Sequence, residues 1–230
     1  MLPYSVVIFD FDGTLCATQE AILYSFKKTF EQMNVTPPAP ATIIEAIATG
    51  GNLSELLPLL HPSLQQEEQA LQEWVLQYRH IYDTDGGRLT TLFQGAEQLF
   101  VKLKEWGICC GVISNKGQRA IEDALERFNL RHYFDLVIGD DPQRPLKKKP
   151  NSMAYEQVIR PTYPHLSPSQ ILMVGDTHAD LLFANNAGLT SCWAAYGYGN
   201  KERCLAANPV FTIHALEQLY PVLTPLAQTK

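Results

Sequence analysis

The chain has 230 residues, of which 46% are apolar and 18% are charged, and its formal net charge is −6. This composition is typical of a soluble globular protein, and the length suffices for one domain with a large insertion or for two domains. The negative charge argues against binding to a nucleic-acid backbone, because such proteins usually carry a basic stripe. No apolar stretch approaches the roughly 20 residues that a membrane-spanning helix needs, so we expect no membrane partner and a cytoplasmic location.

The chain begins with a predicted buried strand that ends in acidic residues. Residues 6–9 are all apolar and rich in β-branched side chains, which is typical of a parallel strand buried on both faces. Asp10 and Asp12 follow, and the period of two of a strand directs both carboxylates to the same side. Gly13 then allows a sharp turn that brings backbone N–H groups close to an anion. Placing two carboxylates this close together lowers the stability of the folded protein, which suggests that they take part in a chemical reaction.

The segment from residue 18 to residue 88 shows only helical patterns. Apolar spacing predicts a helix over 19–33 with Thr18 as its N-cap, short helices over 43–48 and 53–60, and a longer helix over 64–82. We therefore predict an all-helical insert at residues 18–88, with hinges at 16–18 and 83–87.

From residue 95 onward, predicted strands alternate with predicted helices. The strands lie at 108–113, 134–138, 171–174, 191–195 and 210–213, and the helices at 96–106, 117–128, 152–160, 179–187 and 215–223. This alternation predicts an α/β fold, a doubly wound and Rossmann-like parallel sheet with helices on both faces. The predicted core domain comprises residues 1–17 and 89–230, and the helical cap at 18–88 interrupts it after the first strand.

The cysteines lack the C-x-x-C spacing of metal or redox sites, and their number is odd. They are Cys16, Cys109, Cys110, Cys192 and Cys204. We expect reduced thiols that pack in the core.

Four groups of polar residues follow the ends of predicted strands, at the edge where ligands of such sheets bind. Each group also has a structural explanation, because side chains at these places often cap the next helix or belong to a solvated lysine run. Their joint occurrence in this order predicts a single site. The groups are Asp10 with Asp12, Ser114 with Asn115, Lys149, and Asp176 with Asp180.

These groups resemble the four motifs of the haloacid dehalogenase superfamily. The cap resembles that of its phosphoglycolate-phosphatase-like subgroup. Two positions depart from the family pattern: Ala17 stands where an acidic residue is common, and Gln94 where proline is common. The matching stretches are Asp10-Phe11-Asp12-Gly13-Thr14, Val112-Ile113-Ser114-Asn115, Lys149-Pro150 and Val174-Gly175-Asp176-Thr177-His178-Ala179-Asp180.

Phosphoryl transfer requires an in-line nucleophile, a proton donor and fixed positive charge. We expect Asp10 to attack phosphorus and form an aspartyl-phosphate, and Asp12 to protonate the leaving oxygen and then take a proton from water. Carboxylates beside a phosphate require a hard divalent ion, and Mg²⁺ fits. Its expected ligands are Asp10, the backbone carbonyl of Asp12, and Asp176, and the resemblance places Asp180 outside them.

The phosphoryl oxygens need donors of positive character. We expect these to be the Ser114 hydroxyl and the Lys149 ammonium. A register slip of one residue would substitute Lys148, although the Lys-Pro pairing of the family favours Lys149. Backbone N–H groups near Gly13, Thr14 and Asn115 would complete the site.

Substrate choice is expected to lie in the cap, which would close over the site and expel water. Arg79, His80 and Arg88 are candidates for binding a second anionic group of the substrate, although an ordinary helix surface also explains them. The expected substrate is a small phosphorylated metabolite. By resemblance phosphoglycolate comes first, followed by nucleoside monophosphates, pyrophosphate and sugar phosphates.

The same motifs also occur in proteins that are not phosphatases. Asp12 argues against a dehalogenase, because dehalogenating members of the superfamily lack this second acidic residue. A β-phosphoglucomutase-like phosphotransferase remains an alternative, although Thr14 resembles the phosphatases more than the mutases. A non-catalytic binding module is a remote alternative, because all the acidic, hydroxyl and ammonium groups of the motifs are retained.

Overall fold

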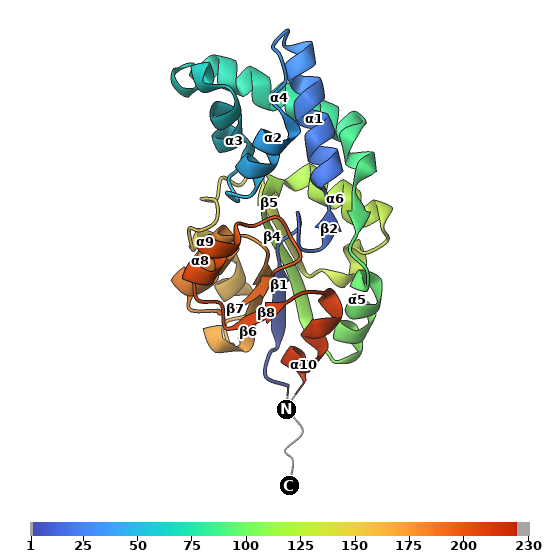
Figure 1. The fold of residues 1–230 in the computed structure, drawn as a ribbon. Helices are drawn as coiled ribbons and strands as arrows, with labels where there is room; N and C mark the ends of the chain where they lie inside the picture. Colours follow the sequence, from blue (N-terminus) through green and yellow to red (C-terminus); the bar gives the residue numbers. More distant parts are fainter. Residues whose placement is uncertain (1, 225–230) are drawn as a thin grey trace.

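The computed structural model describes residues 2–224; residue 1 and residues 225–230, which the predicted core domain includes, lie outside the described part of the chain. Figure 1 shows a sheet with helices on both sides in the lower part of the molecule and a group of helices above it. The carboxyl ends of the sheet strands face this upper group, so the predicted site edge lies beneath it.

The sheet has six parallel strands in the order β5-β4-β1-β6-β7-β8. This order confirms the predicted doubly wound fold, and it places the first strand at the centre of the sheet. Phe9 at the end of this strand is level with Val112 on one neighbour and Val174 on the other. The motifs that follow these three strands are therefore brought side by side. The strands are β1 (Val6–Phe9), β4 (Cys109–Gly117), β5 (Leu136–Asp140), β6 (Ile171–Gly175), β7 (Thr190–Ala194) and β8 (Phe211–Ile213).

Helices cover the two faces of the sheet because the side chains of the central strand alternate between them. Val7 and Phe9 of β1 pack in one hydrophobic cluster with α5 (Ala96–Glu105) and α6 (Gln118–Arg127). Val6 and Ile8 pack on the other face, in a cluster that contains residues of α8 (His178–Ala187). A strand buried on both faces explains why its sequence is continuously apolar. The remaining core helices are α7 (Arg160–Thr162), α9 (Lys201–Ala206) and α10 (Leu219–Leu223).

Some core elements differ from the sequence-based expectation. The predicted helix over 152–160 contains a π-helical turn at Tyr155–Ile159 that continues into α7. Pro161 has no N–H to donate, which interrupts the regular helical bonds there. Strand β4 extends four residues beyond its predicted end at Ile113, and its register against β5 shifts between Ile113 and Gly117.

Residues 19–84 form helices with a hydrophobic cluster of their own. A short antiparallel pair, β2 (Cys16–Ala17) and β3 (Thr91–Leu92), lies where the chain leaves and re-enters the core. The domain boundaries at 17/18 and 88/89 stay a prediction, and they fall beside this pair. The helices are α1 (Gln19–Gln32), α2 (Pro40–Ile47), α3 (Leu53–Leu60) and α4 (Glu68–Thr84), with 3-10 turns at Pro62–Gln66 and Gly86–Leu89.

The start of α1 is held differently from the sequence prediction. Thr18 occupies the N-cap position, but its side chain makes no capping hydrogen bond. Instead, the backbone N–H groups of Thr18 and Gln19 donate to the hydroxyl of Tyr198 at 2.6 and 3.0 Å. A core side chain therefore satisfies amides that the helix leaves unpaired.

All five cysteines are free thiols, four of them buried and Cys109 partly so. Within residues 2–224, no helix has both the length and the apolar character that crossing a membrane requires.

Candidate active site

Three buried carboxylates meet at the carboxyl end of the sheet. Asp10 follows β1, Asp176 follows the adjacent strand β6, and Asp180 lies in the first turn of α8. One carboxylate oxygen from each lies within 4.8 Å of the others. Carboxylate oxygens are the ligands that hard divalent cations prefer, so this acidic cluster could hold a metal ion.

The loop after β1 is fitted closely around Asp176. The hydroxyl of Thr14 donates to Asp176 Oδ1 at 3.2 Å, and the backbone N–H of Tyr198 donates to Oδ2 at 2.7 Å. Gly13 has a φ of +74°, and a Cβ at this position would collide with the Asp176 carboxylate. Glycine is therefore required at residue 13 both for the backbone conformation and for the close approach.

The predicted phosphate-binding role of the Gly13 amide is not supported. Its N–H donates to the carbonyl of Cys16 at 2.9 Å, so the turn itself uses this donor. What Gly13 provides is the shape of the loop.

Lys149 links two members of the acidic cluster. Its ammonium pairs with Asp10 Oδ1 at 2.6 Å and with Asp180 Oδ1, and it donates to the carbonyl of Ile113 at 2.7 Å. The side chain is only 3% exposed. Lys148 pairs with Asp140 instead. The structure therefore places Lys149, and not Lys148, beside Asp10.

Both carboxylate oxygens of Asp180 accept hydrogen bonds. Oδ1 accepts from Lys149, and Oδ2 accepts from the backbone N–H and the hydroxyl of Thr177 at 2.9 and 2.7 Å. These bonds also cap the first turn of α8. Asp180 therefore already has a cationic partner, whereas within residues 2–224 the Asp176 oxygens accept only from the neutral donors Thr14 and Tyr198.

The electrostatics of the cluster are unbalanced towards negative charge. Burial raises the pKa of Asp10 to about 7, opposed by Lys149 and reinforced by Asp180. Burial also raises the pKa of Asp176 well above its ordinary value, and the charges of Asp10 and Asp180 add to this. Burial alone would lower the pKa of Lys149, but the two carboxylates outweigh it and the pKa is raised. A divalent cation would supply the positive charge that one ammonium cannot.

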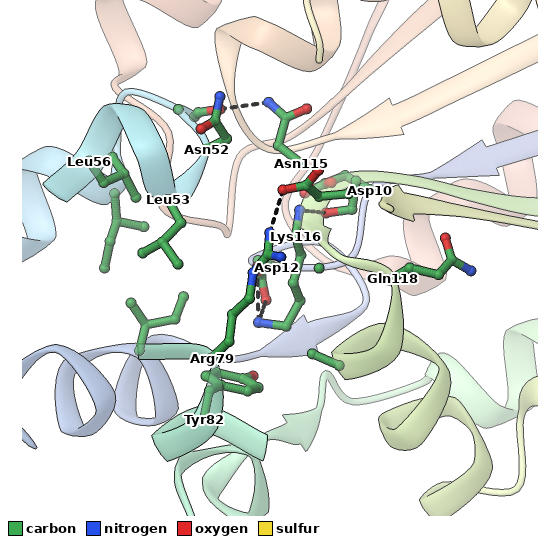
Figure 2. A pocket seen from close by; sticks show the side chains of 18 of the residues that line it. Asp10, Asp12, Asn52, Leu53, Leu56, Arg79, Tyr82, Asn115, Lys116 and Gln118 are labelled. Atoms are coloured by element: carbon green, nitrogen blue, oxygen red, sulfur yellow. Dashed lines mark hydrogen bonds and ion pairs between the residues drawn. The ribbon is translucent and has the colours of Figure 1, made fainter. Parts of the chain in front are cut away.

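Asp12 lies outside this cluster and faces a lysine that the sequence reading did not single out. The Nζ of Lys116 lies 3.2 Å from Asp12 Oδ1 and 3.8 Å from the centre of the Tyr82 ring on α4. Figure 2 shows the Lys116 side chain reaching between these two residues. Burial would lower the pKa of Lys116, but Asp12 and the tyrosines outweigh it and the pKa is raised. The sequence feature that could have identified Lys116 is its position directly after the Ser114-Asn115 pair, at the end of β4.

Ser114 and Asn115 have different surroundings. The buried Ser114 lines the cavity beside the acidic cluster. The Asn115 side chain is used internally: its Oδ1 accepts from Lys149 N at 2.9 Å, and its Nδ2 donates to the carbonyls of Lys149 and Gly50 at 3.1 and 3.0 Å. Asn115 therefore holds the Lys149 loop and contacts the helical insert.

A cavity of about 460 Å³ lies between the acidic cluster and the helices above it. Asp10, Asp12, Ser114, Lys149 and Asp176 line one end. Residues 50–52 line the cavity where the insert meets the core. Figure 2 shows side chains of the insert facing the loops that carry Asp10, Asp12 and Lys116 across this space.

Of the three cationic residues of the insert that were expected to bind substrate, only one lines the cavity. Arg79 lines the cavity, where it pairs with Asp140 at 2.6 Å. Arg88 does not line it, because the 3-10 turn Gly86–Leu89 packs on α1 and leaves the Arg88 side chain exposed. The expectation that Arg88 binds substrate is therefore not supported. His80 is likewise exposed and outside the cavity.

Comparisons with known proteins agree with this arrangement. The profile of the haloacid dehalogenase-like hydrolases matches residues 7–194. A phosphoglycolate phosphatase of Vibrio cholerae is 27% identical over 97% of this chain and 98% of its own length, and the pyrophosphatase PpaX of Bacillus cereus is 25% identical over 96% of each. Among solved structures, a protein from Bacteroides fragilis called haloacid dehalogenase-like superposes with a TM-score of 0.82 at 25% identity, covering 94% of this chain and 99% of that one. A match over most of the chain, with the motif residues gathered at one sheet edge, shows that this protein belongs to the haloacid dehalogenase-like hydrolase family.

Proposed function

We propose that the protein is a Mg²⁺-dependent phosphatase that hydrolyses a small phosphomonoester through an aspartyl-phosphate. The observation that carries the proposal is the acidic cluster of Asp10, Asp176 and Asp180 with Lys149, buried at one end of a cavity. The names of the relatives, a phosphoglycolate phosphatase and a pyrophosphatase, support the reaction class. A cytoplasmic location stays a prediction.

Mg²⁺ would be held by Asp10, Asp176 and the backbone carbonyl of Asp12, and when bound it supplies positive charge to the phosphoryl oxygens. The donor set fits a divalent cation because the carboxylates of Asp10, Asp176 and Asp180 are buried together. Their combined negative charge is larger than the positive charge of the one ammonium that pairs with them. The Asp180 oxygens, which Lys149 and Thr177 engage, would orient the lysine.

In the first step an oxygen of Asp10 forms a bond to phosphorus as the bond to the leaving alkoxide breaks. Asp12 donates a proton to that alkoxide. Its carboxylate lines the cavity, where the Lys116 ammonium lies 3.2 Å from Oδ1 and 3.4 Å from Oδ2. In the second step water attacks phosphorus, Asp12 takes its proton, and the bond to Asp10 breaks to release phosphate.

The other residues position these groups. Lys149 and the Ser114 hydroxyl neutralise and orient the phosphoryl oxygens. Lys116 holds the Asp12 side chain through its ion pair. Asn115 fixes the backbone of Lys149.

The test is phosphate release from p-nitrophenyl phosphate with and without Mg²⁺. Asp10→Asn should lower kcat by about a thousandfold or more, because it removes the nucleophile. Asp123→Asn, which makes the same substitution on an exposed part of α6, is the matched control and should keep its activity. Activity independent of metal, or an active Asp10→Asn variant, would overturn the proposal. Net phosphate release also distinguishes hydrolysis from transfer to a second substrate.

A further inference from the structure

The cationic side chains that line the cavity already have carboxylate partners. The lining contains seven carboxylates and four cationic side chains. Every one of these four cations has a carboxylate partner within the described residues. The pairs are Lys149 with Asp10 and Asp180, Lys116 with Asp12, Arg79 with Asp140, and Arg119 with Asp123.

The part of the cavity beyond the acidic cluster, where a leaving group would lie, has no surplus positive charge. Its carboxylates are Asp12, Asp83, Asp140 and Asp141, against the cations Lys116, Arg79 and Arg119. Arg119 is 80% exposed, so solvent screens its charge. Asp140 is shared by Arg79 and Lys148, so these three side chains carry one net positive charge. That charge is offset by the Asp141 carboxylate of the same lining, which has no cationic partner among the described residues. An anionic group bound here would lose water without gaining a free cation, which is unfavourable.

The same part of the cavity has an apolar wall made by the helical insert. The contributing side chains come from α1, α2 and α3, and Figure 2 shows Leu53 and Leu56 of α3 on the side of the cavity away from Asp10. A wall of this kind favours contact with carbon rather than with a charged group. The apolar side chains are Ile22, Phe26, Ile47, Leu53 and Leu56.

We infer that the leaving group of the substrate is an uncharged alcohol with an apolar portion. The inference rests on the proposed phosphatase activity and narrows it. It gives this chain a different leaving group from the substrates in the names of its relatives. The leaving group of phosphoglycolate carries a carboxylate, and that of pyrophosphate is a second phosphate.

The test compares alkyl phosphates that differ in the charge of the leaving group. Phosphoglycolate and 2-hydroxyethyl phosphate are close in size, and n-butyl phosphate adds apolar surface. In the presence of Mg²⁺, kcat/KM for 2-hydroxyethyl phosphate should exceed that for phosphoglycolate by about tenfold or more, and n-butyl phosphate should be better still. Pyrophosphate should be a poor substrate.

A cation placed in the apolar wall should weaken this preference. Leu53→Lys adds an unpaired ammonium on the cavity side of α3, so the ratio of kcat/KM for phosphoglycolate to that for 2-hydroxyethyl phosphate should rise by about tenfold. Leu59→Lys adds the same charge to the same helix at a side chain that is 56% exposed and outside the cavity, and it should leave the ratio unchanged.

The outcomes distinguish the two proposals. Hydrolysis of phosphoglycolate as fast as or faster than that of 2-hydroxyethyl phosphate overturns the inference and leaves the phosphatase proposal standing. An unchanged ratio in a folded Leu53→Lys variant also overturns it. Failure to hydrolyse any of these esters, or p-nitrophenyl phosphate, overturns the proposed function itself.

Discussion

The ammonium of Lys116 lies 3.2 Å from the carboxylate of Asp12, and the contact joins residues 104 positions apart. The Lys116 side chain is only 8% exposed and stands over the ring of Tyr82 on α4. The contact thus joins the loop after β1, the end of β4 and the helical insert. Replacing Lys116 should therefore affect both the proposed proton donor, Asp12, and the contact of the insert with the core through Tyr82.

Replacement of Lys116 by methionine keeps the length of the side chain and removes its charge. We expect kcat with p-nitrophenyl phosphate to fall by about 10- to 100-fold, because the Asp12 carboxylate loses the partner that holds it. Lys147→Met, at an exposed lysine, is the control. Full activity of a folded Lys116→Met protein would show that the ion pair does not position Asp12.

Metal binding and pH should act together on stability. Burial raises the folded-state pKa of Asp10 to about 7 from an unfolded value of 3.8, so between these values the metal-free folded protein binds more protons than the unfolded chain. The contribution of Asp10 is therefore fully present below the unfolded pKa and is lost as pH rises through the folded pKa. Mg²⁺ requires ionised carboxylates, so its stabilising effect should grow over the same range.

Thermal unfolding with and without saturating Mg²⁺, at about pH 5.5 and about pH 8, measures this coupling. At a Mg²⁺ concentration about 100 times the dissociation constant, the stabilisation should approach about 2.7 kcal/mol at the higher pH. The gain should be smaller at the lower pH, and Asp10→Asn should weaken the pH dependence. An equal shift in Tm at both pH values would contradict the prediction.

The ion pair between Arg79 and Asp140 connects α4 to the end of β5. Both side chains are largely buried, at 31% and 25% exposed, so a double-mutant cycle with alanine should give a coupling energy of about 1 kcal/mol in urea unfolding. The exposed helical pair Arg160 and Glu156 is the comparison and should give about 0.3–0.5 kcal/mol. Equal coupling energies for the two pairs would show that burial adds nothing here.

Tyr198→Phe removes the oxygen that accepts from the first amides of α1. Two backbone donors would then lose their partner, which should lower the free energy of unfolding by about 1–3 kcal/mol. Tyr24→Phe, within α1 itself, is the control for loss of a tyrosine hydroxyl. A Tyr198→Phe protein as stable as the control would mean that water replaces the hydroxyl at no cost.

Much of the architecture could be predicted because its signals are local. The apolar run of β1, the alternation of strands and helices after residue 95, and the helical pattern of the insert each depend on neighbouring residues. The placement of Asp10, Ser114 and Asp176 at one sheet edge follows from the same rule, since parallel strands expose their carboxyl ends together. The irregular helix at 155–159 was less accessible, because the apolar pattern of a segment does not reveal a local change to i→i−5 hydrogen bonds.

The sequence by itself determined the class of fold, the helical insertion and the residues that gather at the sheet edge. Only the tertiary structure decided the partners: Lys116 with Asp12, Tyr198 with the start of α1, Lys148 with Asp140, and Arg79 rather than Arg88 in the cavity. The physical reason is that these contacts depend on how packing orients whole elements across the cavity. Periodicity along the chain carries no information about which side chains meet when distant segments close over one another.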